Sequence, residues 1–396
     1  MNTATAVGGC KEIEAGSETF SREVEQINLP QSSSRVHLAY LDGLRAIAAL
    51  YVLFNHLKWT CFGTGTGQQG LAGVLCCVFG YGHEAVTLFI MLSGFCLTLP
   101  VLGSGEVLRS GSLRFFIKRA RRIIPPYYCD LVLSLILDKL VIGQKTGRFW
   151  DCALPITANA IYAHIFLVQD LFSSLALKID HPLWSISVEW RIYFLFPLLL
   201  LCWRRYGAAA TTGATFAIAF LAAAVCEYRF HYEPSLEYIG VFALGMLAAK
   251  IAYSSGSQFS HLRSLRWDLA SLPCLALCVF CAEHSSWSLY KLDFAFSLMC
   301  FCLLLCVSRP NPNAFGDLLK SSKIARLGLF SYSLYLIHAP LLQIFYEYAF
   351  RSLQDRPMQM FAVLTFVAVP AIVAISYWFY LLFERPFTSS KTVQEI

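Results

Sequence analysis

Apolar blocks of about twenty residues recur along this chain, separated by short polar stretches. Twenty helical residues, at a rise of 1.5 Å each, cross a hydrocarbon core of about 30 Å. The composition agrees, because 57% of the 396 residues are hydrophobic and only 14% are charged, whereas about a quarter are charged in soluble proteins. We therefore predict an all-α, polytopic integral membrane protein, in a membrane that the sequence does not identify.

Ten blocks are predicted to cross the membrane. They lie near residues 38–58, 84–101, 123–142, 183–203, 208–226, 235–253, 269–282, 290–307, 328–347 and 359–383. An eleventh block, 153–172, is doubtful. If it does not cross, the basic loops and both termini fall on one side, as the positive-inside rule expects. These loops are 109–122, 204–205, 263–266 and 309–326. We therefore expect ten crossings, with a re-entrant or surface helix at 153–172. If that block crosses instead, the orientation of every later segment in the membrane is inverted.

The ends of the chain are polar. Residues 1–36 are rich in Ser and Glu and lack the apolar core of a cleavable signal peptide, so they are expected to form a disordered cytosolic tail. Residues 37–384 are expected to form the membrane domain, and residues 385–396 a short cytosolic tail.

The net charge of +6 does not indicate a nucleic-acid partner, because the Lys and Arg residues lie in short loops beside apolar blocks. The 15 cysteines lie mostly inside apolar runs, which favours reduced, buried thiols over disulfides. No pairing of these cysteines with His or carboxylate residues predicts a metal site.

Three ionisable residues lie in the apolar stretch LDGLRAIAALYVLFNH, residues 41–56. Asp42 and Arg45 are three positions apart, so they can pair on one face of a helix. Arg45 and His56 share a face but lie about 16 Å apart along the axis, so they would mark two depths of one cavity. The alternative is a structural Asp42–Arg45 pair and a histidine that is merely hydrogen-bonded. Charges at bilayer depth are costly, and this favours a functional role.

Five blocks of the sequence resemble the signature blocks of the acyltransferase-3 family, in the family's order. They are YLDGLRAIAALYVLFNH (40–56), FIMLSGF (89–95), RFFIKRARRIIPPYY (114–128), PLWSISVEWRIYFLFPLLL (182–200) and LGLFSYSLYLIHAPLL (327–342). The resemblance implies an integral membrane O-acyltransferase that moves an acyl group, often acetyl, from acyl-CoA to a hydroxyl of a sugar, lipid or small molecule. It implies acyl-CoA and a hydroxylated acceptor as partners, besides the lipid bilayer, with no permanently bound cofactor and no metal.

The resemblance also assigns roles to individual residues. It makes His56 the catalytic base, with Arg45 as its motif partner. Glu189 matches the family's glutamate, and we expect it at a depth similar to that of His56, where its carboxylate could orient the imidazole. Arg45, Arg119 and Arg122 would bind the phosphates of the coenzyme. Ser93 and Gly94 are expected to serve close helix packing.

The chain departs from the family at two places. The family often has an acidic residue where Thr87 stands, although Glu84, one turn earlier, could supply a charge. Many members also have an acidic residue or Gln after the glutamate, where this chain has Trp190 and Arg191. These differences bear on acceptor specificity.

Other function classes remain open. A transporter or receptor could use the same charges to line a pathway, and a degenerate family member could bind acyl-CoA without transfer. The absence of a G-x-S-x-G motif favours direct transfer over an acyl-serine intermediate.

Overall fold

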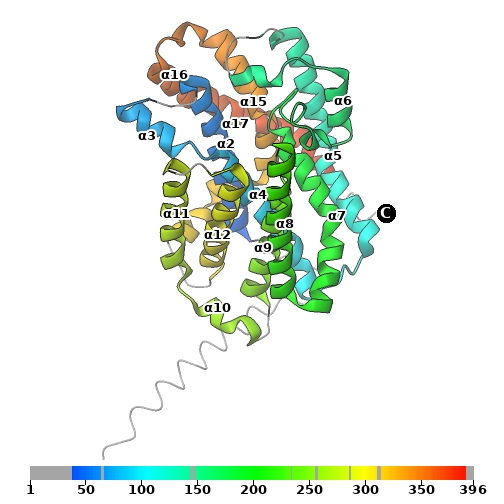
Figure 1. Ribbon diagram of the computed structural model, residues 1–396. Helices are drawn as coiled ribbons and strands as arrows, with labels where there is room; N and C mark the ends of the chain where they lie inside the picture. The colour runs from blue at the N-terminus through cyan, green and yellow to red at the C-terminus, as the bar shows by residue number, and fades with distance from the viewer. Residues whose placement is uncertain are drawn as a thin grey trace, which may run out of the picture. The chain divides into compact units, whose positions relative to one another are not determined.

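The computed structural model describes residues 38–388, except 64–66, 143–144, 146–148, 233, 255–256, 285–286 and 310–313. The predicted N-terminal tail therefore lies outside the described residues, as do residues 389–396 of the predicted C-terminal tail. All the regular elements in the described part are helical, as the ribbon in Figure 1 shows.

Each of the ten predicted membrane segments contains a helix. The helices are α2 (Ala39–Phe62), α4 (Gly82–Leu102), α5 (Gly111–Leu137), α7 (Leu183–Tyr206), α8 (Ala208–Phe230), α9 (Glu237–Tyr253), α11 (Trp267–His284), α12 (Leu289–Val307), α15 (Ser331–Ile344) and, for the last segment, α16 (Pro357–Val363) with α17 (Val369–Phe379). Shorter helices lie between them or, for α18, after the last of them: α3 (Gly70–Val78), α6 (Ala158–Ile165), α10 (Ser260–Ser264), α13 (Ala314–Lys320), α14 (Ser322–Leu329) and α18 (Arg385–Thr388).

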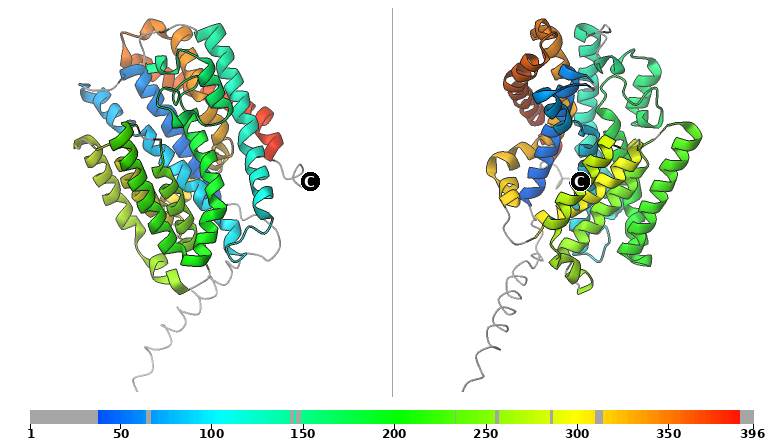
Figure 2. Two further views of the ribbon diagram at one scale, coloured as in Figure 1. Left: turned by 45° about the vertical axis from the view of Figure 1, so that its right-hand side comes forward. Right: turned by 60° about the vertical axis from the view of Figure 1, so that its left-hand side comes forward.

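Within the described residues, five helices are long and apolar enough to cross a membrane, or up to seven if two bent pairs each count as one span. One of these pairs is α14 with α15, which meet at a bend of 72°. The prediction of an all-α, polytopic membrane protein is confirmed, and the long helices run roughly side by side (Figure 2).

Two glycines bring α4 and α9 into backbone contact. A Cβ atom on Gly94 would lie 2.2 Å from the carbonyl oxygen of Phe242, and one on Gly245 would lie 2.1 Å from that of Met91. No side chain fits at either position without separating the helices. The expectation that Gly94 serves close packing is therefore confirmed.

The helix within the doubtful block 153–172 is too short to span the membrane. This helix, α6, has eight residues, about 12 Å at 1.5 Å per residue, against a hydrocarbon core of about 30 Å. In Figure 1, α6 and the irregular chain around it lie at the same end of the bundle as α16. The expectation of a surface or re-entrant segment agrees with this length.

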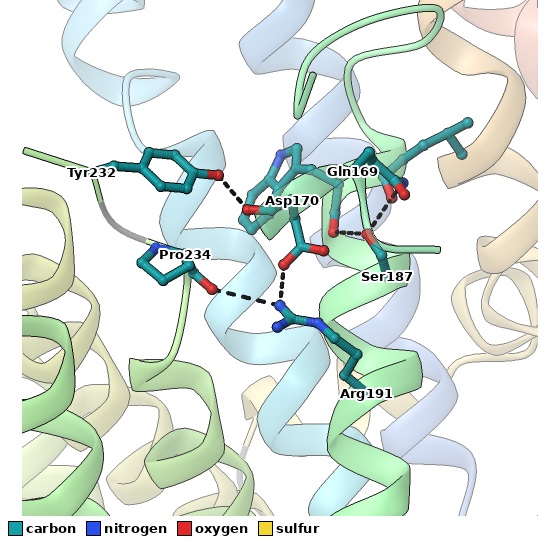
Figure 3. Close-up of polar contacts among 8 residues, drawn as sticks. Gln169, Asp170, Ser187, Arg191, Tyr232 and Pro234 are labelled. Carbon is teal, nitrogen blue, oxygen red and sulfur yellow. Dashed lines mark hydrogen bonds and ion pairs between the residues drawn. The ribbon is translucent and has the colours of Figure 1, made fainter. Parts of the chain in front are cut away.

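An ion pair fastens this segment to the bundle (Figure 3). Arg191 of α7 donates to the buried carboxylate of Asp170, and Tyr232, between α8 and α9, donates to the backbone carbonyl of Asp170. Gln169 donates to the Leu183 carbonyl at 2.9 Å. One departure from the family pattern, Arg191, thus anchors the segment that precedes α7.

Candidate active site

A cavity lies among α2, α4, α5, α7 and α15. It contains about 770 Å³ of space free of protein atoms, part of it open to solvent. Four of the residues for which sequence analysis predicted a catalytic or coenzyme-binding role line it together: Arg45, Arg119, Arg122 and Glu189. They come from three helices, so the fold brings the predicted coenzyme-binding cations to a single site.

The cations in this cavity differ in their partners. Arg45 Nη1 donates to Asp42 Oδ1 at 2.9 Å, which confirms the predicted pair, and its Nη2 lies 3.0 Å from the sulfur of Cys96. The Nε atom of Arg119 is buried and has no hydrogen-bond partner within the described residues. Because a buried donor without a partner costs free energy, this position suits an anionic ligand.

Glu189 has different neighbours from those expected. Its Oε1 atom accepts hydrogen bonds from the hydroxyls of Ser93 and Tyr193. Glu189 lies six residues into α7, about 9 Å along the axis from the helix start, and this depth places it with the arginines. The expectation that Glu189 pairs with His56 is therefore wrong. Ser93, for which a packing role was expected, also lines the cavity, and its hydrogen bond to Glu189 joins α4 to α7.

His56 lies in a cluster of three histidines beyond the inner end of the cavity. Its Nδ1 is 2.7 Å from Nε2 of His338, and its Nε2 is 2.9 Å from Nε2 of His181. All three side chains are buried. His181 lies in the loop ahead of α7, and burial lowers the pKa of its imidazole to about 3, so this ring is neutral at physiological pH.

The hydrogen bonds fix which nitrogen carries the proton when all three rings are neutral. The carbonyl oxygen of Tyr335 can only accept, so the Nδ1 of His338, 2.7 Å away, is the donor. The Nε2 of His338 must then accept from the Nδ1–H of His56. It follows that the Nε2 of His56 carries a lone pair, toward which His181 directs an N–H.

Two residues of the cavity lining lie close in the sequence to members of the histidine cluster. Ser185 and Tyr335 both line the cavity, and their hydroxyls lie 2.7 Å apart. Ser185 follows His181 by four residues, and Tyr335 precedes His338 by three. His56 itself is eleven residues from Arg45 on the continuous helix α2, so the two lie about 16 Å apart along the axis.

A carboxylate lies beside Thr87, that of Asp293. Thr87 donates to Asp293 Oδ1 at 2.8 Å, and His83 Nε2 lies 3.0 Å from Oδ2. Asp293 is on α12, so no local sequence signal links it to Thr87. Glu84, which we had considered for this charge, is also buried.

His181 and His338 were not singled out from the sequence. His338 lies within the quoted block LGLFSYSLYLIHAPLL, and His181 directly precedes PLWSISVEW. The family blocks could therefore have drawn attention to both. Although three histidines meet, no group of three or more His, Cys, Asp or Glu side chains within the described residues could hold a metal ion. The nitrogens instead pair with one another.

Comparison with known proteins places the chain in context. The acyltransferase domain family matches residues 38–381. Nodulation protein 10 of Rhizobium leguminosarum bv. viciae is 29% identical over 255 residues, which cover 59% of this chain and 65% of that protein. The putative peptidoglycan O-acetyltransferase YrhL of Bacillus subtilis is 26% identical over 325 residues, which cover 76% of this chain and 48% of YrhL.

The peptidoglycan O-acetyltransferase OatA of Listeria monocytogenes is 28% identical over 179 residues, which cover 44% of this chain and 26% of OatA. The matched regions thus span less than two thirds of the length of each of these three relatives. No solved structure matches the chain.

Proposed function

This chain belongs to the acyltransferase-3 family of multi-pass membrane proteins, and we propose that it transfers an acyl group from acyl-CoA to a hydroxyl of a sugar, lipid or small-molecule acceptor. We favour acetyl as the transferred group, since two of the relatives are named O-acetyltransferases.

The lining of the cavity supports acyl-CoA as the donor. Arg45, Arg119 and Arg122 face one space, and the Nε of Arg119 lacks a hydrogen-bond partner within the described chain. Guanidinium groups bind phosphate oxygens through charge-assisted hydrogen bonds. On the predicted topology, these arginines lie toward the cytosol, where acyl-CoA is available.

The histidine cluster supports His56 as the general base. Acyl transfer to an alcohol needs a group that removes the hydroxyl proton, and the Nε2 lone pair of His56 can do so. His338 is its positioning residue, because it accepts the Nδ1–H and so keeps the basic nitrogen at Nε2. The acceptor hydroxyl needs the position that the His181 N–H occupies, so His181 turns aside when the acceptor binds.

The reaction then balances without a covalent enzyme intermediate. The acceptor oxygen bonds to the thioester carbonyl carbon while His56 takes the hydroxyl proton. The carbon–sulfur bond breaks, and the electron pair goes to sulfur. His56 returns the proton to the thiolate, which leaves as coenzyme A. Glu189 contributes negative charge among the arginines. Its carboxylate accepts hydrogen bonds from Ser93 and Tyr193 and so holds these two cavity-lining side chains in place.

The single observation that carries this proposal is the meeting of three arginines in one cavity, whose lining also includes Ser185 and Tyr335, the near neighbours in sequence of His181 and His338. The distance of about 16 Å along α2 between Arg45 and His56 is one that a long acyl-CoA molecule can bridge from its phosphates to the base.

The test uses purified full-length protein in detergent or nanodiscs, with acetyl-CoA as donor, water standing in for the acceptor hydroxyl, and release of free thiol as the readout. We expect thiol release that depends on the protein, and a loss of at least about a hundredfold in His56→Ala. A matched control is His261→Ala, an exposed histidine on α10. Binding of acetyl-CoA to His56→Ala should stay normal. Thiol release unaffected by His56→Ala would rule out the proposed base, and a carrier without transferase activity would release none.

A further inference from the structure

A second hollow lies outside the active-site cavity, between α14 and the end of the last membrane segment. It contains about 1140 Å³ of space free of protein atoms, much of it open to solvent. Its lining combines three cations with apolar and aromatic side chains: Lys323, Arg326, Leu327, Leu329, Phe330, Tyr377, Tyr380, Leu381 and Arg385. We call this hollow the basic groove.

The three cations of the basic groove, Lys323, Arg326 and Arg385, are exposed. Eight ion pairs occur in the described chain, and none of them involves these residues. The Nε of Arg326 donates to the Ser322 carbonyl, so its other guanidinium nitrogens remain available. Three like charges around one hollow repel one another, and an anion would relieve this repulsion.

Aromatic rings form part of the wall. The rings of Tyr377 and Tyr380 lie 6.3 Å apart with an interplanar angle of 27°, and Phe330 meets Tyr377 edge-on at 5.4 Å. Tyr377 is 46% exposed. An exposed ring beside cations offers a stacking surface for a planar base. A simple inorganic anion would not need such a surface.

The basic groove adjoins the active-site cavity. Phe330 lines the groove, while the next two residues, Ser331 and Tyr332, line the cavity. At the other wall, Glu384 accepts a hydrogen bond from Ser333 at 2.5 Å, and Arg385 follows it directly. Helix α18, which begins at Arg385, packs against α5, the helix that carries Arg119 and Arg122.

We propose that the basic groove binds the nucleotide end of the acyl-CoA donor. Lys323, Arg326 and Arg385 contact its 3′-phosphate, and Tyr377 stacks on the adenine. The diphosphate then passes Ser331 and Tyr332 to meet Arg119 and Arg122, and the pantetheine arm extends from it into the cavity. This assignment rests on the proposed function, and it adds a separate site that selects coenzyme A over smaller thioesters.

The coenzyme without its 3′-phosphate, dephospho-CoA, isolates the predicted contact. Binding of CoA and of dephospho-CoA is measured by calorimetry on the full-length protein and on the triple variant Lys323→Gln, Arg326→Gln, Arg385→Gln. The matched control is Arg204→Gln with Arg205→Gln, two exposed arginines at the end of α7 that line neither hollow.

We expect the parent protein and the control to bind CoA at least about tenfold more tightly than dephospho-CoA, since one charge-assisted contact is worth about 1.5–3 kcal/mol. The triple variant should lose this preference while binding dephospho-CoA as the parent does, which also shows that it is folded.

Three results would overturn the assignment, and they differ in what they say about the proposed function. If the parent protein binds neither compound, the donor is not acyl-CoA and both proposals fail. If the triple variant keeps the preference for CoA, or if the parent shows none, the groove does not hold the 3′-phosphate, while the proposed function stands. If the triple variant keeps the preference but loses phosphatidylglycerol from anionic nanodiscs, the groove holds a lipid headgroup instead.

Discussion

The Nδ1 of His56 lies 2.7 Å from the Nε2 of His338, although the two residues are 282 positions apart in the sequence. His338 in turn is tied to the backbone carbonyl of Tyr335. This chain of hydrogen bonds determines the tautomer of His56 and therefore which of its nitrogens can act as a base.

Replacing His338 separates a positioning role from a merely structural one. Gln at this position can present an oxygen that accepts from the Nδ1–H of His56, whereas Leu cannot. We expect His338→Leu to lower kcat by about a hundredfold, because the base loses its orientation, and His338→Gln to retain most of the activity. The KM for acyl-CoA should stay unchanged in both variants. Equal losses in the two variants would contradict the tautomer argument.

Neutralising the cavity cations should weaken donor binding. We expect the double variant Arg119→Gln, Arg122→Gln to raise the KM for acyl-CoA about tenfold or more, with a smaller change in kcat at saturating donor. Steady-state kinetics over a range of acyl-CoA concentrations measure this. The control is Arg114→Gln with Lys118→Gln on the same helix, neither of which lines the cavity. A similar rise in KM in the control would indicate general charge attraction.

The close approach of α4 and α9 predicts a difference between two glycines. A Cβ on Gly94 would meet the Phe242 carbonyl at 2.2 Å, whereas one on Gly213 of α8 would meet nothing within 4 Å. We expect Gly94→Ala to destabilise the protein by about 1–3 kcal/mol through overpacking. Gly213→Ala should be neutral or stabilising, because Ala is a better helix former. Thermal unfolding in detergent measures both, and a stable Gly94→Ala variant would show that the helices can separate freely.

The predicted topology can be tested at two exposed turns. Cys61 follows the first predicted span, 38–58, and would face the side opposite the basic loops, but it lies buried in the last turn of α2, so a reagent cannot reach it. Gln68, between α2 and α3, and Ser110, before α5, are exposed. Because α4 separates them, Gln68→Cys and Ser110→Cys should react with an impermeant maleimide from opposite sides of sealed vesicles.

This labelling requires a background in which the exposed native Cys77 is replaced. Ser110 precedes the basic segment of α5, so it should be labelled on the cytosolic side. Labelling of both cysteines from the same side would show that α4 does not cross, and the cytosolic position of the arginines would then have no support.

Local patterns were enough to predict the helices. Whether a segment of about twenty residues prefers the membrane depends on its own apolar content and on the charges beside it, so each predicted span contains a helix. The pair Asp42–Arg45 was likewise predictable, because three positions on a helix bring side chains together whatever surrounds them. The five family blocks also indicated which arginines and which glutamate were candidate site residues, and these residues line one cavity.

The partners across helices were decided only by tertiary packing. His181 meets His56 across 125 positions, and Thr87 meets Asp293 across 206. Glu189 pairs with Ser93 and Tyr193 rather than with His56, whose two ring nitrogens meet His338 and His181 instead. The sequence determines which side chains a helix carries and how they are spaced along it. Which of those side chains face one another depends on how far neighbouring helices slide and rotate as their surfaces pack, and no single segment contains that information.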